Sequence, residues 1–186
     1  DTYLLKMVDI YMEAIIGTGE EHIKHIARKV IEQKGDRVYT FTRERIKWHK
    51  EQGHIVIAIS GSPLELVKEM SEKYHMDDYR GTIYKLDENG KYNGEVVPMW
   101  DSDSKQKAIN ELVEKHDIDL SKSYAYGDTS GDYTMFKSVG CPFAINPTKE
   151  LLGKIKNDES LKDKINLIVE RKDVTYKLDM NSIEII

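Results

Sequence analysis

The sequence has little cysteine or proline and no long apolar run. Its 186 residues include one cysteine, Cys141, and four prolines. No disulfide can therefore form within the chain, and a reducing, cytoplasmic setting is expected. No apolar stretch approaches the roughly 18 residues of a membrane-spanning helix, and neither a membrane segment nor a signal peptide is predicted. Lysine and arginine form no basic stripe, which argues against a nucleic-acid partner.

Two signatures of nucleotide-binding proteins are also missing. The sequence contains neither Gly-x-Gly-x-x-Gly nor Gly-Lys followed by Ser or Thr, so an unrelated nucleotide-binding α/β module is disfavoured. The composition that remains is highly charged, with 39% hydrophobic residues, 33% charged residues and a net charge of -5. These values indicate a folded chain long enough for one domain, or one domain with a small appendage.

Apolar residues recur at helical spacing in three segments near the beginning, at about residues 3–16, 20–34 and 42–51. The period then changes, because residues 54–59 read His-Ile-Val-Ile-Ala-Ile. Such a continuous run of branched residues predicts a strand buried on both faces. Ser62 and Glu65 then fit a capping box, with Pro63 at the first helical position, which predicts a helix as far as about His75.

Strands and helices alternate through the rest of the chain. Residues 82–86 and 92–98 flank Glu-Asn-Gly-Lys and predict a hairpin. Further strands are expected at 124–127, 141–145 and 165–170, and helices at 104–116, up to 138, and from Asn146-Pro147 through 155, while residues 175–186 remain ambiguous. This alternation predicts a three-layer, doubly wound parallel α/β sheet.

Polar loops follow two of the expected strands, where ligands bind in such sheets. Ser60-Gly61-Ser62 offers a hydroxyl, an accessible backbone and a helix start, which suit phosphate, although a plain capping turn is the simpler alternative. Asp128 and Asp132 lie four residues apart and could bind Mg²⁺, or could instead cap the next helix. Lys105 opens the helix between these loops and could offset phosphate charge.

The ordered set Ile-Ala-Ile-Ser60-Gly61-Ser62-Pro63, then Lys105, then Ser-Tyr-Ala-Tyr-Gly127-Asp128-Thr-Ser-Gly-Asp132 resembles the haloacid-dehalogenase-like superfamily. It is similar to the phosphoserine-phosphatase-like branch, whose loops have the same order, and the hairpin before Lys105 also fits that branch. The resemblance covers residues 37 to about 150. It implies that residues 1–36 are the C-terminal part of a helical cap and residues 37–186 a haloacid-dehalogenase-like α/β core.

The resemblance also implies a chemistry, a Mg²⁺-dependent hydrolysis of a small phosphorylated metabolite through an aspartyl-phosphate. Ser60 would hold the transferring phosphoryl group, and Gly61 would add backbone contacts. Lys105 would neutralise the phosphate and the nucleophile. Asp128 would hold Mg²⁺, and Asp132 would complete the metal site by orienting a metal-bound water, or would orient Lys105.

The family's first motif, Asp-x-Asp-x-Thr, carries the nucleophile and is missing here. Asp101-Ser-Asp103 and Asp117-Ile-Asp119 have the spacing, but neither follows an apolar strand. The sequence also opens with Asp1 inside a helical pattern. We therefore expect the nucleophile and the central strand of the sheet in an N-terminal segment missing here, and we expect the chain alone to be inactive.

A non-catalytic alternative remains open. In it, a degenerate or truncated relative would bind a phosphorylated ligand or a protein partner, which absence of the nucleophile favours. Retention of Ser60, Lys105, Asp128 and Asp132 together argues against it, because a pure scaffold has no physical need for such a set. Neither the substrate nor the oligomeric state follows from the sequence.

Overall fold

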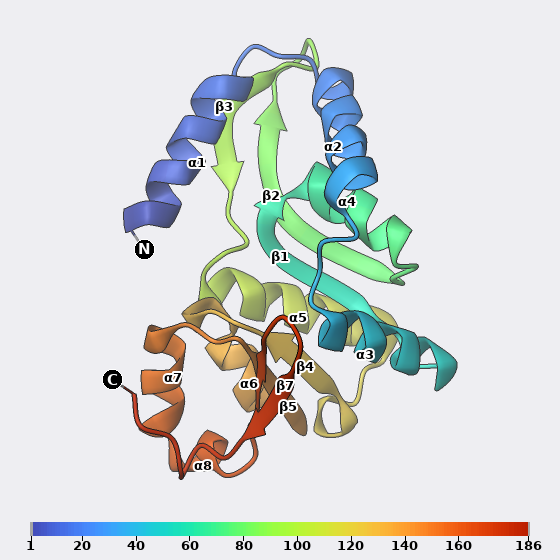
Figure 1. Ribbon diagram of the computed structural model, residues 1–186. Helices are drawn as coiled ribbons and strands as arrows, with labels where there is room; N and C mark the ends of the chain where they lie inside the picture. Colours follow the sequence, from blue (N-terminus) through green and yellow to red (C-terminus); the bar gives the residue numbers. More distant parts are fainter. Residues whose placement is uncertain (1, 186) are drawn as a thin grey trace. The chain divides into compact units, whose positions relative to one another are not determined.

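The computed structural model describes residues 2–185, and Asp1 and Ile186 lie outside the described part (Figure 1). Packing divides the chain into two compact units. The first consists of Asp1–Val38 and His49–Met99, and the second of Tyr39–Trp48 and Trp100–Ile186. Each unit has its own sheet and is described by itself. The expected boundary between cap and core at residues 36 and 37 stays a prediction.

The first unit combines a small sheet with three helices: α1 (Thr2–Ile15), α2 (Glu20–Lys34), β1 (Ile57–Pro63), α4 (Leu64–Lys73), β2 (Asp78–Leu86) and β3 (Tyr92–Val97). Strands β1 and β2 are parallel, and β2 and β3 form the antiparallel hairpin that the sequence predicts. Gly90 turns the hairpin with a φ of 71°. Tyr11 of α1 packs against Tyr84 of β2, with ring centroids 4.9 Å apart.

The second unit is built on a four-stranded sheet in the order β4-β5-β6-β7. Its elements are most of α3 (Thr40–Glu51), α5 (Ser102–His116), η1 (Leu120–Lys122), β4 (Tyr124–Gly127), η2 (Ser130–Asp132), α6 (Tyr133–Ser138), β5 (Cys141–Ile145), α7 (Lys149–Lys156), α8 (Glu159–Lys162), β6 (Asn166–Glu170) and β7 (Thr175–Leu178). The first three strands are parallel, and β7 returns antiparallel to β6. The first four residues of the ambiguous segment 175–186 form strand β7.

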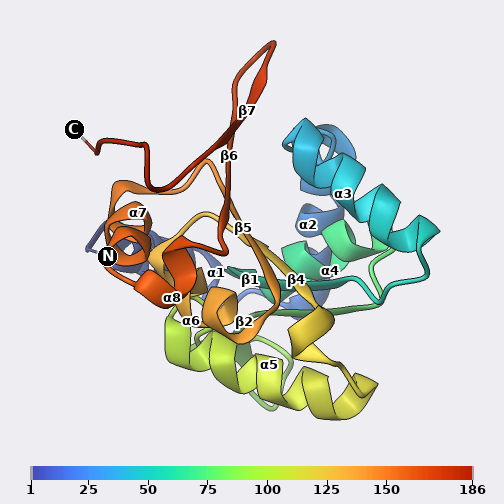
Figure 2. The same ribbon diagram turned by 90° about the horizontal axis from the view of Figure 1, so that it is seen from below.

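Both faces of this second sheet are covered. Successive side chains of a strand point to opposite faces, so each strand contributes to both layers of packing. Ala125 and Ala144 belong to a buried core that includes Phe136, which is fully shielded from solvent. On the other face, Phe143 lies 6.1 Å from Phe41 of α3, and Tyr124 meets α3 in an edge-to-face contact with Trp48. In the view from below, α3 and α6 lie on opposite sides of β4 and β5 (Figure 2). The predicted three-layer α/β architecture is therefore confirmed in this unit.

The first predicted strand differs from the observed one in position and burial. It begins at Ile57 instead of His54, continues through Pro63, and leaves Ile55 49% exposed. Its residues are mostly half-buried, so the expectation of burial on both faces is wrong. Within the described residues β1 pairs with β2 alone, and an edge strand is covered less than a central one.

The predicted capping box at Ser62 and Glu65 is also wrong. Pro63 occupies the N-cap of α4, and no side chain caps this helix. Ser62 still belongs to β1, and its N–H donates to the Ser60 Oγ at 3.2 Å. Glu65 is turned away from the helix end, because its carboxylate accepts a hydrogen bond from the Tyr92 hydroxyl at 2.8 Å.

Asn146 and Pro147 do not open the next helix. Asn146 has a left-handed φ of 46°, and its side chain accepts a hydrogen bond from the Glu170 N–H. Thr148 caps α7 instead, with its side chain accepting from the Leu151 N–H. In the described part of the chain, no helix is long and apolar enough to cross a membrane.

Candidate functional site

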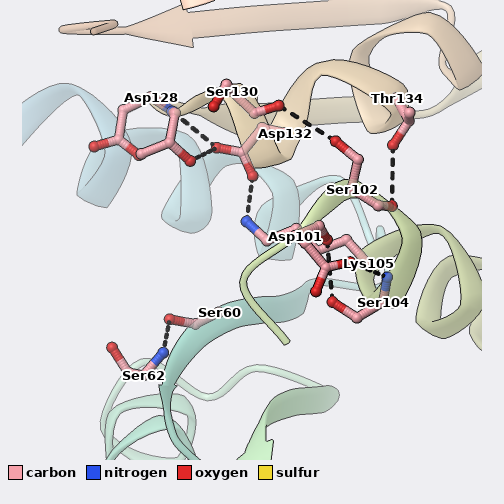
Figure 3. A network of polar contacts seen from close by, with 11 residues as sticks. Ser60, Ser62, Asp101, Ser102, Ser104, Lys105, Asp128, Ser130, Asp132 and Thr134 are labelled. Atoms are coloured by element: carbon pink, nitrogen blue, oxygen red, sulfur yellow. Dashed lines mark hydrogen bonds and ion pairs between the residues drawn. The ribbon is translucent and has the colours of Figure 1, made fainter. Parts of the chain in front are cut away.

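A buried ion pair joins the first turn of α5 to η2 (Figure 3). The Lys105 Nζ lies 2.5 Å from the Asp132 Oδ1, and their side chains are 8% and 6% exposed. Charges removed from water in this way depend on each other, because either one alone would be left buried without compensation. The pair therefore fixes the direction of the lysine ammonium.

The second oxygen of Asp132 is also fully engaged. The Asp132 Oδ2 accepts hydrogen bonds from the N–H groups of Asp128 and Thr129, both at 3.1 Å, and from the Thr129 hydroxyl at 3.3 Å. One carboxylate thus holds the lysine with one oxygen and folds the loop after β4 with the other. The Asp132 carboxylate therefore positions Lys105 and the loop after β4.

The two glycines of this loop are required by close approaches. A Cβ on Gly127 would lie 2.5 Å from the Asp132 carboxyl carbon and Oδ2, and a Cβ on Gly131 would collide with the carbonyl of Trp100. The first glycine lets the carboxylate lie over the end of β4. The second lets the segment leading into α5 approach the loop, which brings Lys105 within reach of Asp132.

The start of α5 is held in place by hydrogen bonds that the sequence analysis did not predict. Asp101 caps the helix by accepting from the Ser104 N–H at 2.8 Å, which lowers the pKa of Asp101. The Ser102 hydroxyl donates to the Ser130 carbonyl at 3.3 Å, and the Thr134 hydroxyl donates to the Ser102 carbonyl at 3.4 Å (Figure 3). The Asp-x-x-Ser capping pattern could have been found in the sequence, whereas the other contacts join distant segments.

Asp128 differs from Asp132 in the partners of its carboxylate. Among residues 2–185, no side chain hydrogen-bonds or ion-pairs with it. Although Asp128 reaches solvent, partial loss of hydration raises its pKa, and the neighbouring charge of Asp132 raises it further against the opposing effect of Lys105. A carboxylate kept ionised in this setting is stabilised by any cation that binds it.

The donor set fits one part of a magnesium site. Mg²⁺ is usually bound by one or two carboxylates together with water and substrate oxygens. Asp128 can supply one such oxygen, whereas both oxygens of Asp132 already accept hydrogen bonds. Over the described residues, no group of three or more His, Cys, Asp or Glu side chains could hold a metal ion. The described residues therefore supply only part of such a ligand set.

The structure brings Lys105, Asp128 and Asp132 together in the second unit, whereas Ser60 and Gly61 belong to the first. In that first unit, the Ser60 Oγ accepts from the Ser62 N–H, and the Gly61 carbonyl accepts from a buried threonine, Thr82, at 2.8 Å. The loop is therefore a defined turn at the end of a strand.

The haloacid dehalogenase-like hydrolase family matches residues 3–137, which is well over half of the chain. The chain belongs to this family. This membership confirms the resemblance drawn from the three ordered motifs.

Similar proteins place the chain near the phosphoserine phosphatases. It is 31% identical over 143 residues to an "Inhibition of morphological differentiation protein" of Streptomyces azureus, covering 76% of this chain and 52% of that protein. It is 26% identical over 132 residues to a phosphoserine phosphatase of Methanocaldococcus jannaschii, covering 70% and 57%. The chain thus spans about half the length of these curated relatives.

A solved structure supports the same fold. The structure titled "Phospho-Aspartyl Intermediate Analogue of Phosphoserine phosphatase" matches 92% of this chain and 81% of its own, with a TM-score of 0.59 and 21% identity. The predicted haloacid-dehalogenase-like α/β fold is therefore confirmed, and the similarity to the phosphoserine phosphatase above supports the predicted branch.

Proposed function

We propose that the protein containing this chain is a Mg²⁺-dependent phosphomonoester hydrolase that acts through an aspartyl-phosphate. The observation that carries the proposal is the buried pair of Lys105 and Asp132 next to the Asp128 carboxylate, which no other side chain of the described residues hydrogen-bonds. Family membership and the phosphatases among the relatives support it. The substrate would be a small phosphorylated metabolite, and a cytoplasmic setting remains our expectation.

Lys105 would offset the negative charge of the phosphoryl group and of the attacking carboxylate. An ammonium fixed in advance stabilises developing charge without having to reorganise during the reaction. Asp132 would keep Lys105 in place through its Oδ1 and would orient Asp128 through the backbone bonds to its Oδ2. Its contribution to a metal site would therefore be made through these neighbours.

Asp128 would supply a carboxylate oxygen to Mg²⁺. The bound cation would neutralise phosphate oxygens and assist the loss of the leaving group. Ser60 and the backbone of Gly61 would contact the transferring phosphoryl group. The order of the three motifs in the family supports assigning Ser60 to the same reaction, although it belongs to the other unit.

The aspartate that attacks phosphorus would be supplied from outside these 186 residues. Within the sequence no Asp-x-Asp-x-Thr follows an apolar strand. The described strands support this arrangement, because β1 pairs only with β2 and β4 only with β5. Each of these two strands therefore has one edge at which a further strand can pair.

The test compares full-length protein, including any segment that precedes this chain, with its Asp128→Asn variant. With p-nitrophenyl phosphate as substrate, the substitution should lower Mg²⁺-dependent turnover by roughly 100-fold or more, because a carboxylate ligand is lost. Mg²⁺ should also raise the thermal midpoint of the wild type and not that of the variant, since a cation that binds only the folded state stabilises it.

Asp103→Asn provides the matched control, because Asp103 is an exposed carboxylate in the first turn of α5. This variant should keep both turnover and the Mg²⁺ response. Unchanged turnover in Asp128→Asn would refute the metal assignment. A wild type that binds phosphate esters and hydrolyses none would favour the non-catalytic alternative.

A further inference from the structure

The loop that carries Ser60 is a bulge in the pairing of β1 with β2. Two paired positions flank it, Ile59 with Arg80 and Pro63 with Thr82. Residues 60–62 therefore stand opposite the single residue Gly81. Extra residues on one strand push its backbone out of the ladder and redirect its side chains. The shape of the loop is thus set by the strand beside it.

The side chain of Thr82, in β2, bonds directly to this bulge. Its hydroxyl donates to the Gly61 carbonyl at 2.8 Å, and the residue is fully buried, with 0% exposure. Because Thr82 is fully buried, its hydroxyl cannot turn to water, and loss of this hydroxyl would remove the bond that holds the Gly61 carbonyl. The hydroxyl of Thr82 therefore holds the middle residue of the bulge in place.

Gly81 completes the arrangement by allowing a close approach. A Cβ at this position would lie 2.8 Å from the Leu64 Cα and 3.1 Å from the Ser62 carbonyl oxygen. Only glycine lets the end of the bulge and the start of α4 lie this close to β2. The Gly81-Thr82 step thus determines where the bulge ends and where α4 begins.

We propose that Thr82 is a positioning residue for the phosphate-binding loop, acting through the Gly61 carbonyl to direct the Ser60 hydroxyl. Because the Ser60 Oγ already accepts from the Ser62 N–H, its own O–H is left to donate. The acceptor is a phosphoryl oxygen, so this inference rests on the proposed function.

The test uses full-length protein, p-nitrophenyl phosphate and three variants. Thr82→Val keeps the shape of the side chain and removes the hydroxyl, whereas Thr82→Ser keeps the hydroxyl. Ser71→Ala is the matched control, because Ser71 is buried in the same unit and its hydroxyl has no hydrogen-bond partner in the described structure. All kinetics are run well below the thermal midpoint of each variant.

Thr82→Val should lower kcat/KM by about 10-fold or more, mostly through kcat. A displaced Ser60 hydroxyl loses more stabilisation of the transition state than of the bound substrate. Thr82→Ser should stay within about threefold of the wild type, and Ser71→Ala should match it. The proposal is overturned if Thr82→Val keeps wild-type kcat/KM, or if Thr82→Ser falls as far as Thr82→Val.

Hydrogen exchange of the Ser62 amide separates this inference from the proposed function. Exchange should be about 10-fold faster in Thr82→Val than in the wild type and unchanged in Ser71→Ala, because the loosened bulge opens more often. If the wild type shows no turnover, the proposed function fails, and faster exchange in Thr82→Val alone still supports the positioning role. Unchanged exchange overturns it.

Discussion

At the scale of single residues, the two aspartates of one loop perform different tasks. Asp132 is buried and has every oxygen occupied, whereas Asp128 reaches solvent and its carboxylate has no side-chain partner in the described chain. The first is needed for structure, and the second is held at an energetic disadvantage. Sites that bind charged ligands often combine a carboxylate that stabilises the fold with one that destabilises it, because a group available to a ligand lacks partners in the protein.

Asp132→Asn should strongly destabilise the protein. The substitution leaves the Lys105 ammonium buried without a countercharge, which typically costs about 3–5 kcal/mol. Urea unfolding, followed by circular dichroism, would measure the loss. As a control, Lys122→Met removes an exposed partner of Asp119 and should leave the unfolding midpoint unchanged. Equal effects of the two substitutions would show that burial of the pair does not matter.

Asp128→Asn should have the opposite effect when no divalent cation is present. A carboxyl whose pKa is raised by folding is destabilising when ionised. This cost is absent below the ordinary pKa of about 3.9 and is complete above the raised value. The variant should therefore exceed the wild type in unfolding free energy near neutral pH, and the difference should fade as the pH falls toward about 3. A variant less stable than the wild type at neutral pH would contradict this account.

At the scale of elements, the glycines explain why strand β4 ends as it does. Gly127 makes room for the Asp132 carboxylate, and no other residue type could do so without moving it. The turn after β4 is therefore fixed by a steric requirement as well as by hydrogen bonds. A comparison of glycines that differ only in their surroundings can isolate this effect.

Gly127→Ala should lower both stability and turnover, because its Cβ displaces the carboxylate that holds Lys105. Gly153→Ala is the control, since Gly153 lies inside α7 with nothing within 4 Å of the added Cβ. This control should stabilise the protein by about 0.5–1 kcal/mol, because alanine is the better helix former. Thermal unfolding and phosphatase kinetics on both variants would decide the matter. A tolerated Gly127→Ala would show that the loop can relax without cost.

Local patterns predicted many of these elements well. The bounds of α2, β4 and β5 agree with the residues expected from periodicity, because helix and strand spacing is written in neighbouring residues. The capping box at Ser62 failed because β1 continues through Pro63, which pairs with Thr82 of β2 about 20 positions away in the sequence. Asn146 failed for a similar reason, since its side chain binds the backbone of β6.

At the scale of the whole molecule, motif order predicted the family and the cluster of Lys105, Asp128 and Asp132. The supporting contacts could not be predicted. The approach of Gly131 to Trp100 and the bond from Ser102 to Ser130 each join segments roughly 30 residues apart. Sequence periodicity does not predict such contacts, because they depend on how helices and strands pack in the tertiary structure.

The capping of α3 by Glu170 has a consequence for the order of events during synthesis. The two carboxylate oxygens of Glu170 accept from the Thr40 and Phe41 N–H groups, both at 2.8 Å. The last residue of the first unit, Met99, leaves the ribosome roughly 70 residues before Glu170, which amounts to several seconds at ordinary elongation rates. Until β4 and β5 emerge within that interval, the aromatic face of α3 lacks the strands it packs on. A nascent chain paused before residue 124 would therefore expose this face to chaperones.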